Sequence, residues 1–162
     1  MQESSNKIIQ SGEIVSFDTD MVGPYGYCAD ISRAFVEGNK FNDEQKKLYS
    51  MAVDQINHNY RIIKPGVSFK EFTERSWTLP DEYYGNRYSV MLHGIGMCDE
   101  WPAIRYPTDG GQRNGQFEKN MTITLESYIG KVGGKEGVKL EQQYLVGENG
   151  LELMSHHPLE DI

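Results

Sequence analysis

Three acidic residues around a short turn constrain this chain more than any other feature. Asp18, Asp20 and Asp30 flank a turn with glycine and proline at positions 23–26. Apolar residues lead into the first two acids and follow the third, which predicts two strands joined by a hairpin-like connection. On antiparallel neighbours these carboxylates can converge, and they then repel one another unless a cation neutralises them. The stretch therefore indicates either a cation site or three solvated loop acids.

The acidic balance of the chain limits its partners. A formal net charge of -8 over 162 residues would attract neither nucleic acid nor an anionic membrane. Cys28 and Cys98 are too few for a disulfide framework, which favours a reducing compartment. No apolar run approaches the ~18 residues of a membrane span, and we see no signal-peptide pattern. We expect a soluble, cytoplasmic protein of one-domain length.

Two helix signals follow the hairpin. Asn42 precedes two acids and a run with helical apolar spacing, so it is an expected N-cap. Ser68 and Glu71 have the form of a capping box, which predicts a second, shorter helix to about Trp77. Because further strand patterns come later, we expect an α+β domain with its helices on one face of a sheet.

The second half of the chain holds one histidine and two glutamates of interest. His93 begins a Gly-punctuated stretch, interpreted as a loop, in which Asp99 and Glu100 follow. Glu126 ends an alternating strand pattern and Glu141 lies inside another. Taken singly, each glutamate is expected to face water, because a buried, unpaired carboxylate costs several kcal/mol.

Considered together, these residues favour a metal site. The set contains five carboxylates and one imidazole: Asp18, Asp20, Asp30, His93, Glu126 and Glu141. Hard oxygen donors with one nitrogen suit a pair of divalent ions such as Mn, Fe, Co or Zn, bridged by shared carboxylates.

In this order, the residues resemble the dinuclear metal set of the pita-bread metallohydrolases, which include methionine aminopeptidases, Xaa-Pro aminopeptidases, prolidases and creatinase. The flanks also match, as in Asp30-Ile-Ser-Arg, His93-Gly-Ile-Gly and Val138-Lys-Leu-Glu141. The resemblance implies the pita-bread fold, incomplete at its N-terminus. By that resemblance residues 1–162 are the C-terminal, ligand-bearing portion of the catalytic domain. We expect its N-terminal half and any N-terminal domain to be absent, and an exposed apolar face where the missing half would pack.

The departures from the peptidase pattern point to one branch. Asp18 and Asp20 lie twelve and ten residues before Asp30, on either side of the peptidase spacing. Asp99 stands where the peptidases have a second, substrate-contacting His, and Ser127 replaces the Pro that follows their first Glu ligand. This pattern resembles the dimethylsulfoniopropionate lyase branch, which cleaves a sulfonium zwitterion to dimethyl sulfide and acrylate.

The lyase resemblance assigns a role to each site residue. It implies that the five carboxylates and His93 bind two divalent metal ions. Iron is the expected metal, and Mn, Co and Zn are the alternatives. It makes Asp99 the catalytic base and Tyr88 a substrate-site residue. A sulfonium cation has no N–H donor, so we expect aromatic faces, Tyr88 and Trp101, to hold it. Asp99, beside Trp101, is expected to be partly desolvated with a raised pKa. The implied partner is this small zwitterion, with a homodimer in the full-length protein.

Other interpretations stay open from sequence. The alternative enzyme is a peptidase-like hydrolase that acts on Xaa-Pro dipeptides or as an aminopeptidase, an interpretation weakened by the absence of the second His. A third possibility is an inactive, metal-depleted binding or remnant module. The sequence also leaves open whether Asp18 binds metal directly or orients Asp20 from outside the ligand set.

Overall fold

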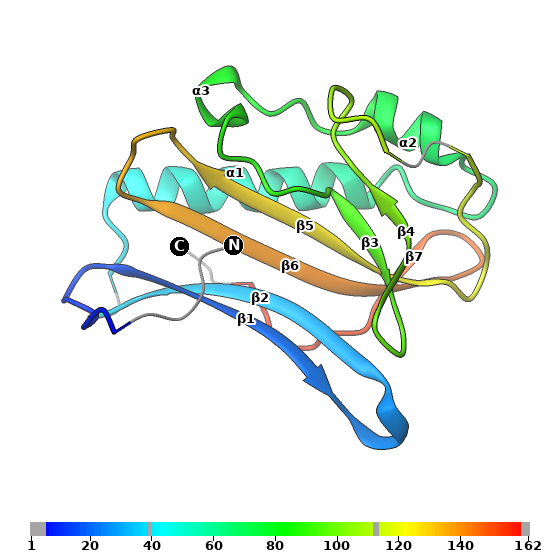
Figure 1. The fold of residues 1–162 in the computed structure, drawn as a ribbon, viewed down its shortest axis with the longest axis horizontal. Helices are drawn as coiled ribbons and strands as arrows, with labels where there is room; N and C mark the ends of the chain where they lie inside the picture. The colour runs from blue at the N-terminus through cyan, green and yellow to red at the C-terminus, as the bar shows by residue number, and fades with distance from the viewer. Residues whose placement is uncertain (1–5, 39, 112–113, 160–162) are drawn as a thin grey trace.

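The structure is a computed structural model that describes residues 6–38, 40–111 and 114–159 (Figure 1). In chain order its strands are β1 (Ile14–Val22), β2 (Cys28–Val36), β3 (Leu92–Ile95), β4 (Asp99–Ile104), β5 (Thr122–Gly130), β6 (Gly137–Val146) and β7 (Leu151–Leu153). The helices are the short 3-10 helix η1 (Pro24–Gly26), α1 (Asp43–Tyr60), α2 (Phe69–Arg75) and α3 (Asp81–Tyr84).

Strands β1 and β2 form the predicted hairpin. They pair antiparallel along their whole length, and η1 makes the connection between them. Gly26 in this turn has a φ of 85°, a conformation that glycine adopts without steric cost. The register sets Asp20 directly opposite Asp30 and Asp18 opposite Ser32. The predicted convergence of acids is therefore built into the pairing of the two strands.

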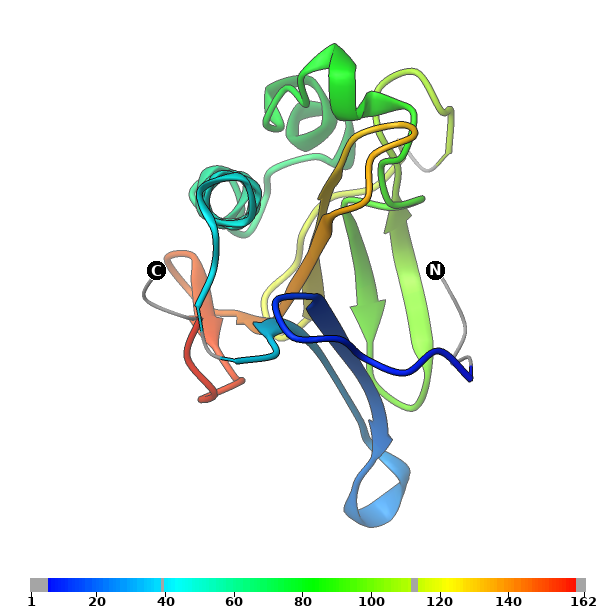
Figure 2. The same ribbon diagram turned by 90° about the vertical axis from the view of Figure 1, so that its left-hand side faces the viewer.

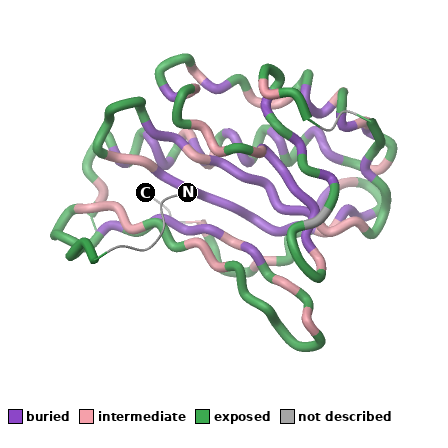
Figure 3. Tube along the Cα trace, in the orientation of Figure 1, coloured by how far each residue is buried: buried purple, intermediate pink, exposed green. Residues whose placement is uncertain are grey.

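The other five strands form an antiparallel sheet in the order β4-β3-β5-β6-β7. Helix α1 packs on β5 and β6, and β2 lies alongside β6 (Figures 1 and 2). Covered in this way, β5 and β6 are buried along most of their length (Figure 3). Side chains on these two strands, acids included, therefore lie largely away from water.

The two predicted helices begin where expected. Asn42 caps α1 with a reciprocal capping box to Gln45, and Ser68 accepts a hydrogen bond from the Glu71 amide at the start of α2. The helices gather on one side of the sheet, with α1 against its face (Figure 2). The expected α+β class is confirmed.

The stretch after His93 differs from its prediction. It forms a β-hairpin, with His93 on β3 and Asp99 at the start of β4, rather than a loop. Glycines 94 and 96 led to the loop interpretation, because glycine is depleted in strands. The pairing of β3 with β4 shifts register between His93 and Gly94, so the strands accommodate the glycine through a bulge-like irregularity.

The end of the β1–β2 hairpin carries exposed apolar side chains. Met21, Val22, Tyr25 and Tyr27 each lie more than half exposed, and this end projects away from the sheet (Figure 3). Whether these side chains belong to the apolar face expected against a missing half stays a prediction.

Candidate metal centre

Two pairs of acids face each other across antiparallel strands. Asp20 lies opposite Asp30 on the β1–β2 hairpin, and Glu126 lies opposite Glu141 on β5 and β6. Like charges directly opposite each other destabilise a sheet. Asp30, Glu126 and Glu141 are all buried, which increases the cost. The expectation that each glutamate, taken singly, faces water is therefore wrong, and the arrangement requires positive charge.

His93 brings the two acid pairs together. Its Nε2 atom lies 3.2 Å from Glu126 Oε1, 3.5 Å from Asp30 Oδ2 and 3.6 Å from Glu141 Oε1. Its Nδ1 atom lies 2.9 Å from the Gly94 carbonyl oxygen. A proton on Nδ1 donated to that carbonyl leaves the Nε2 lone pair free for a metal, as in the neutral imidazole ligands of metal sites.

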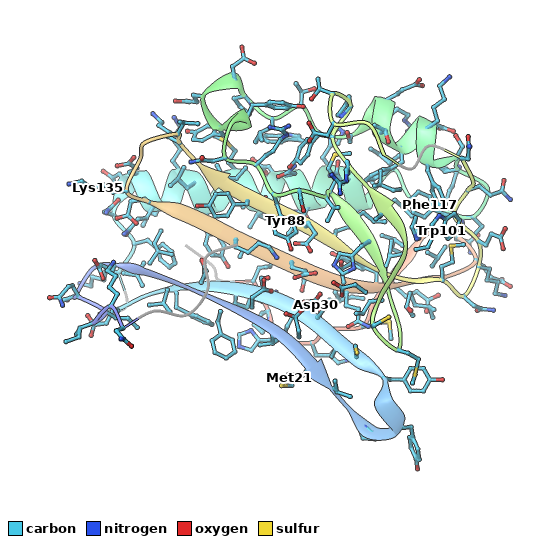
Figure 4. The ribbon with its side chains drawn as sticks, viewed as in Figure 1. Met21, Asp30, Tyr88, Trp101, Phe117 and Lys135 are labelled. Atoms are coloured by element: carbon cyan, nitrogen blue, oxygen red, sulfur yellow. The ribbon has the colours of Figure 1, made fainter. Side chains whose placement is uncertain are left out.

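Unsatisfied oxygens in the same place show that the site fits a cation. Asp30 Oδ1 and Glu141 Oε1 are buried and have no hydrogen-bond partner among the described residues. Figure 4 shows Asp30 on β2 directed toward the sheet, whereas Met21 lies on the outer side of the hairpin. Buried carboxylate oxygens normally have partners. Oxygen and imidazole donors suit divalent transition ions. The side chains at this site therefore fit the divalent ions expected from the sequence.

The ligand atoms form two overlapping groups. Asp30, His93 and Glu141 offer atoms within 4.8 Å of one another, and so do Asp20, Asp30 and Asp99. Asp30 belongs to both groups, the position expected of a bridging carboxylate. Sequence reasoning assigned Asp99 to catalysis alone, yet the structure also places its carboxylate beside Asp20 and Asp30.

Asp18 has a different environment from Asp20. Its Oδ1 atom accepts a hydrogen bond from the Ser32 hydroxyl, and its Oδ2 atom lies 3.5 Å from Lys139 Nζ. Asp20 is exposed, whereas the side chain of Asp18 is only 20% exposed. These contacts place Asp18 at the edge of the cluster, on the side of Lys139.

Lys139 is the site residue that sequence reasoning missed. Its Nζ atom lies 2.6 Å from Glu126 Oε2 and 3.1 Å from Glu141 Oε2, and it donates a 2.8 Å hydrogen bond to Ser32 Oγ. The available signal was its position two residues before Glu141 on β6, since residues two apart on a strand share a face. A lone lysine in a strand gives no other indication of burial.

The acids and the imidazole strongly perturb one another. Burial and the charge of Glu141 raise the pKa of Asp30 to about 9. Burial lowers the pKa of His93, but the close carboxylates of Glu126 and Glu141 outweigh burial and raise it to about 11. Without metal the imidazole is therefore a cation that partly neutralises the cluster. A metal ion must displace its proton in order to bind Nε2.

A pocket opens beside His93. Its volume is about 550 Å³, and its lining consists of Tyr88, Ser89, Val90, His93, Asp99, Trp101 and Ala103. The three residues predicted for substrate and catalysis thus face one space next to the proposed metal ligands, and Figure 4 shows Tyr88 and Trp101. Trp101 packs edge-on against Phe69, with 4.9 Å between ring centroids. The pocket brings together aromatic faces, an acid and the proposed metal ligands.

The expected desolvation of Asp99 is wrong for this chain. Its side chain is 74% exposed, and its Oδ1 atom lies 3.9 Å from His93 Nδ1. Asp99 begins β4 at the end of the β3–β4 turn, where water reaches it. Proximity to Trp101 in sequence does not bury it, because Trp101 is itself 53% exposed.

Comparisons with known proteins agree with this geometry. The model of metallopeptidase family M24 matches residues 1–148. Over 98% of its length the chain is 39% identical to dimethylsulfoniopropionate lyase DddP of Roseovarius nubinhibens, and it covers 36% of that protein. It is 32% identical to an Xaa-Pro dipeptidase of Pyrococcus horikoshii, over 91% of this chain and 40% of the relative.

Among solved structures, the crystal structure of the prolidase from Pyrococcus horikoshii OT3 matches with a TM-score of 0.83 and 25% identity. The match covers 98% of this chain and 44% of the prolidase. The chain thus has the pita-bread fold over a part of such a domain, and it spans 36–44% of the length of these relatives.

Proposed function

The chain belongs to metallopeptidase family M24, and on this premise we propose that it carries the metal site of a dimethylsulfoniopropionate lyase. The proposed ligands are Asp18, Asp20, Asp30, His93, Glu126 and Glu141. The single observation that carries the proposal is the pocket in which Asp99, Tyr88 and Trp101 face one space beside His93. The greater identity to the lyase than to the dipeptidase also supports this choice.

The reaction is an elimination in which each change of bonding can be assigned. Two bound divalent ions would supply positive charge to hold the substrate carboxylate and stabilise the charge that develops on the adjacent carbon. Asp99 removes the proton from that carbon. The electron pair of the broken carbon–hydrogen bond forms the carbon–carbon double bond of acrylate. As the carbon–sulfur bond breaks, the sulfur takes the electron pair of that bond and leaves as dimethyl sulfide.

The side chains of the pocket suit this substrate. Tyr88 and Trp101 offer aromatic faces to a sulfonium cation, which attracts the negative face of a ring. The Asp99 carboxylate is 74% exposed and lines the pocket, so a substrate that enters the pocket can reach it. Closure of the pocket around the substrate would strengthen this base by removing water.

Gas release tests the proposal directly. The metal-loaded chain is incubated with dimethylsulfoniopropionate, and dimethyl sulfide in the headspace and acrylate in solution are quantified. We expect equimolar products, loss of both on chelation, and loss of both in Asp99→Asn. The matched control is Asp54→Asn, an exposed acid on α1, which should keep full activity. No gas from a chain with bound metal would overturn the lyase function.

The second candidate is a dipeptidase that acts on Xaa-Pro substrates. It is favoured by the structural match to the Pyrococcus prolidase and by the family. Release of proline from an Xaa-Pro dipeptide by the metal-loaded chain, without dimethyl sulfide from the sulfonium, would support it. Neither product from a chain that fails to bind metal would favour the remnant module.

Three finer features belong to the same proposal. Iron is the proposed metal, with Mn, Co and Zn as alternatives that these ligand types also accept. A cytoplasmic location is proposed on the basis of two free cysteines, Cys28 and Cys98. No helix in the described ranges is long and apolar enough to cross a membrane. A homodimer of the full-length protein is proposed from the family resemblance, and sedimentation would test it.

A further inference from the structure

We propose that Lys139 is a built-in counter-ion of the carboxylate cluster, which stabilises the metal-free site and weakens its affinity for metal. This inference rests on the proposed metal site. It assigns a role to a residue outside the ligand set: Lys139 is a positioning residue that contacts the acids rather than the substrate.

The contacts of Lys139 are those of a buried, fully engaged ammonium. Its side chain is 5% exposed, and Nζ lies within 3.5 Å of oxygens on Asp18, Glu126 and Glu141. The Ser32 hydroxyl accepts from it at 2.8 Å. Three carboxylates this close to Nζ favour its charged form.

The ammonium of Lys139 also lies over an aromatic ring. Nζ lies 4.6 Å from the centroid of the Tyr88 ring, within the range of a cation–π interaction. Tyr88 lines the substrate pocket. Lys139 thus connects Tyr88 to the acids on β5 and β6, and its loss is expected to free this ring as well.

Charge balance indicates why a lysine occupies this place. The proposed ligand set contains five carboxylates, and two divalent ions would leave one negative charge uncompensated when His93 is neutral. The single ammonium of Lys139 cancels that charge. Lys139 Nζ lies 2.6 Å from Glu126 Oε2, on the opposite oxygen from the one that faces His93.

A positive charge in the cluster has opposite effects on the two states. It attracts the carboxylates when metal is absent, and it repels the metal ions when they are present. Because stability and binding are linked, a residue that stabilises the metal-free fold more than the metal-bound fold must weaken metal binding. Removing the charge should therefore destabilise the metal-free chain and tighten metal binding.

The test compares four proteins: wild type, Lys139→Gln, Lys139→Arg and the control Lys131→Gln. Lys131 pairs with Glu82 and is half exposed, so it controls for the loss of a surface ion pair. Melting temperature is measured with a chelator and with saturating Mn²⁺, and Mn²⁺ affinity is measured by calorimetry. We expect Lys139→Gln to lower the metal-free melting temperature by roughly 10 °C and to bind Mn²⁺ about tenfold more tightly.

The outcomes separate this inference from the proposed function. Lys139→Arg keeps the charge and should resemble wild type in both measurements. If Lys139→Arg is as unstable as Lys139→Gln, packing and not charge matters, and the inference is overturned. Weaker Mn²⁺ binding by Lys139→Gln also overturns it. If the wild-type chain binds no Mn²⁺, the proposed function fails, while the metal-free melting temperatures still decide whether Lys139 is a counter-ion.

Discussion

The two acid pairs of this protein have the same cross-strand geometry in different surroundings. Glu126 and Glu141 lie on the central strands of the five-stranded sheet, are buried, and already contact His93 and Lys139. Asp20 and Asp30 lie on a two-stranded hairpin, and Asp20 is exposed. One pair is held by the core of the domain, the other by a projecting ribbon.

The difference indicates that the sheet and the hairpin hold their metal ligands in different ways. The sheet presents its ligands in fixed positions because packing and resident cations hold them before metal arrives. The hairpin ligand Asp20 depends more on the ion itself, since its side chain is exposed whereas Asp30 on β2 is buried against the sheet. We therefore expect substitutions in the sheet pair to abolish metal binding, and substitutions in the hairpin pair to reduce it.

The largest effect is expected from Glu141→Gln. This change removes a charge from the buried pair and from the group that includes Asp30 and His93. Bound metal, measured by elemental analysis after dialysis, should fall to near zero, and turnover should fall with it. The matched control is Glu152→Gln, which alters an exposed glutamate on the neighbouring β7. Full metal content in Glu141→Gln would contradict the central place of the sheet pair.

Asp99→Asn should separate catalysis from metal binding. Loss of a general base costs about 10²- to 10⁴-fold in rate, so kcat for dimethyl sulfide release should fall by this factor. Metal content should stay unchanged, because Asp99 is exposed and is proposed as the base. If Asp99→Asn loses one ion, then Asp99 is a ligand, as its position beside Asp20 and Asp30 would permit.

A smaller effect is expected from Asp20→Asn on the hairpin. It should reduce bound metal from about two ions to about one per chain, because the sheet group keeps its ligands. The metal-free melting temperature should not fall, since Asp20 is exposed and its removed charge faced another acid. Glu37→Gln, an exposed acid just beyond β2, serves as the control. Equal loss in Asp20→Asn and Glu141→Gln would remove the distinction between the two pairs.

The metal content of Asp18→Asn decides whether Asp18 binds metal directly or only orients a ligand. Removing a side chain that only orients a ligand typically costs 10- to 100-fold in metal affinity. Loss of an ion in Asp18→Asn as complete as in Asp20→Asn would mean that Asp18 binds metal directly. A smaller loss of affinity would mean that it acts through Ser32 and Lys139.

The mildest test varies pH. The folded-state pKa of Asp30 is raised from 3.8 to about 9, and that of His93 from 6.5 to about 11. Both groups bind protons more tightly in the folded state, so their contributions are complete at low pH and are lost as pH rises toward these values. Between about pH 6.5 and 9 the metal-free chain should lose stability. Metal affinity should rise over the same interval, because binding releases protons. Parallel trends in the two quantities would contradict these assignments.

Much of the fold was predictable because its signals are local. Alternating apolar residues and turn residues predicted β1, β2, β5 and β6, and capping residues predicted the starts of α1 and α2. The clustering of Asp30, His93, Glu126 and Glu141 was also predicted, since acids in apolar strands need a common cation. These residues lie far apart in the sequence, but their types alone, acids in apolar strands with one histidine, predict that they cluster.

The remaining features depend on tertiary contacts. The β3–β4 hairpin was missed because its glycines have low strand propensity, and pairing with β5 overrides that preference. The exposure of Asp99 follows from its place at the end of a turn rather than from its neighbour Trp101. Lys139 was missed because a lysine in a strand normally reaches water, and only the packing of β2 against β6 encloses it.

Electron paramagnetic resonance of the chain with two equivalents of Mn²⁺ tests the central claim most directly. If the sheet pair and the hairpin pair share Asp30 in one centre, the two ions lie close together and their spins couple. The expected result is a broad, exchange-coupled spectrum that Glu141→Gln abolishes. A spectrum of isolated Mn²⁺ at both equivalents, or of free Mn²⁺ alone, would contradict a dinuclear site.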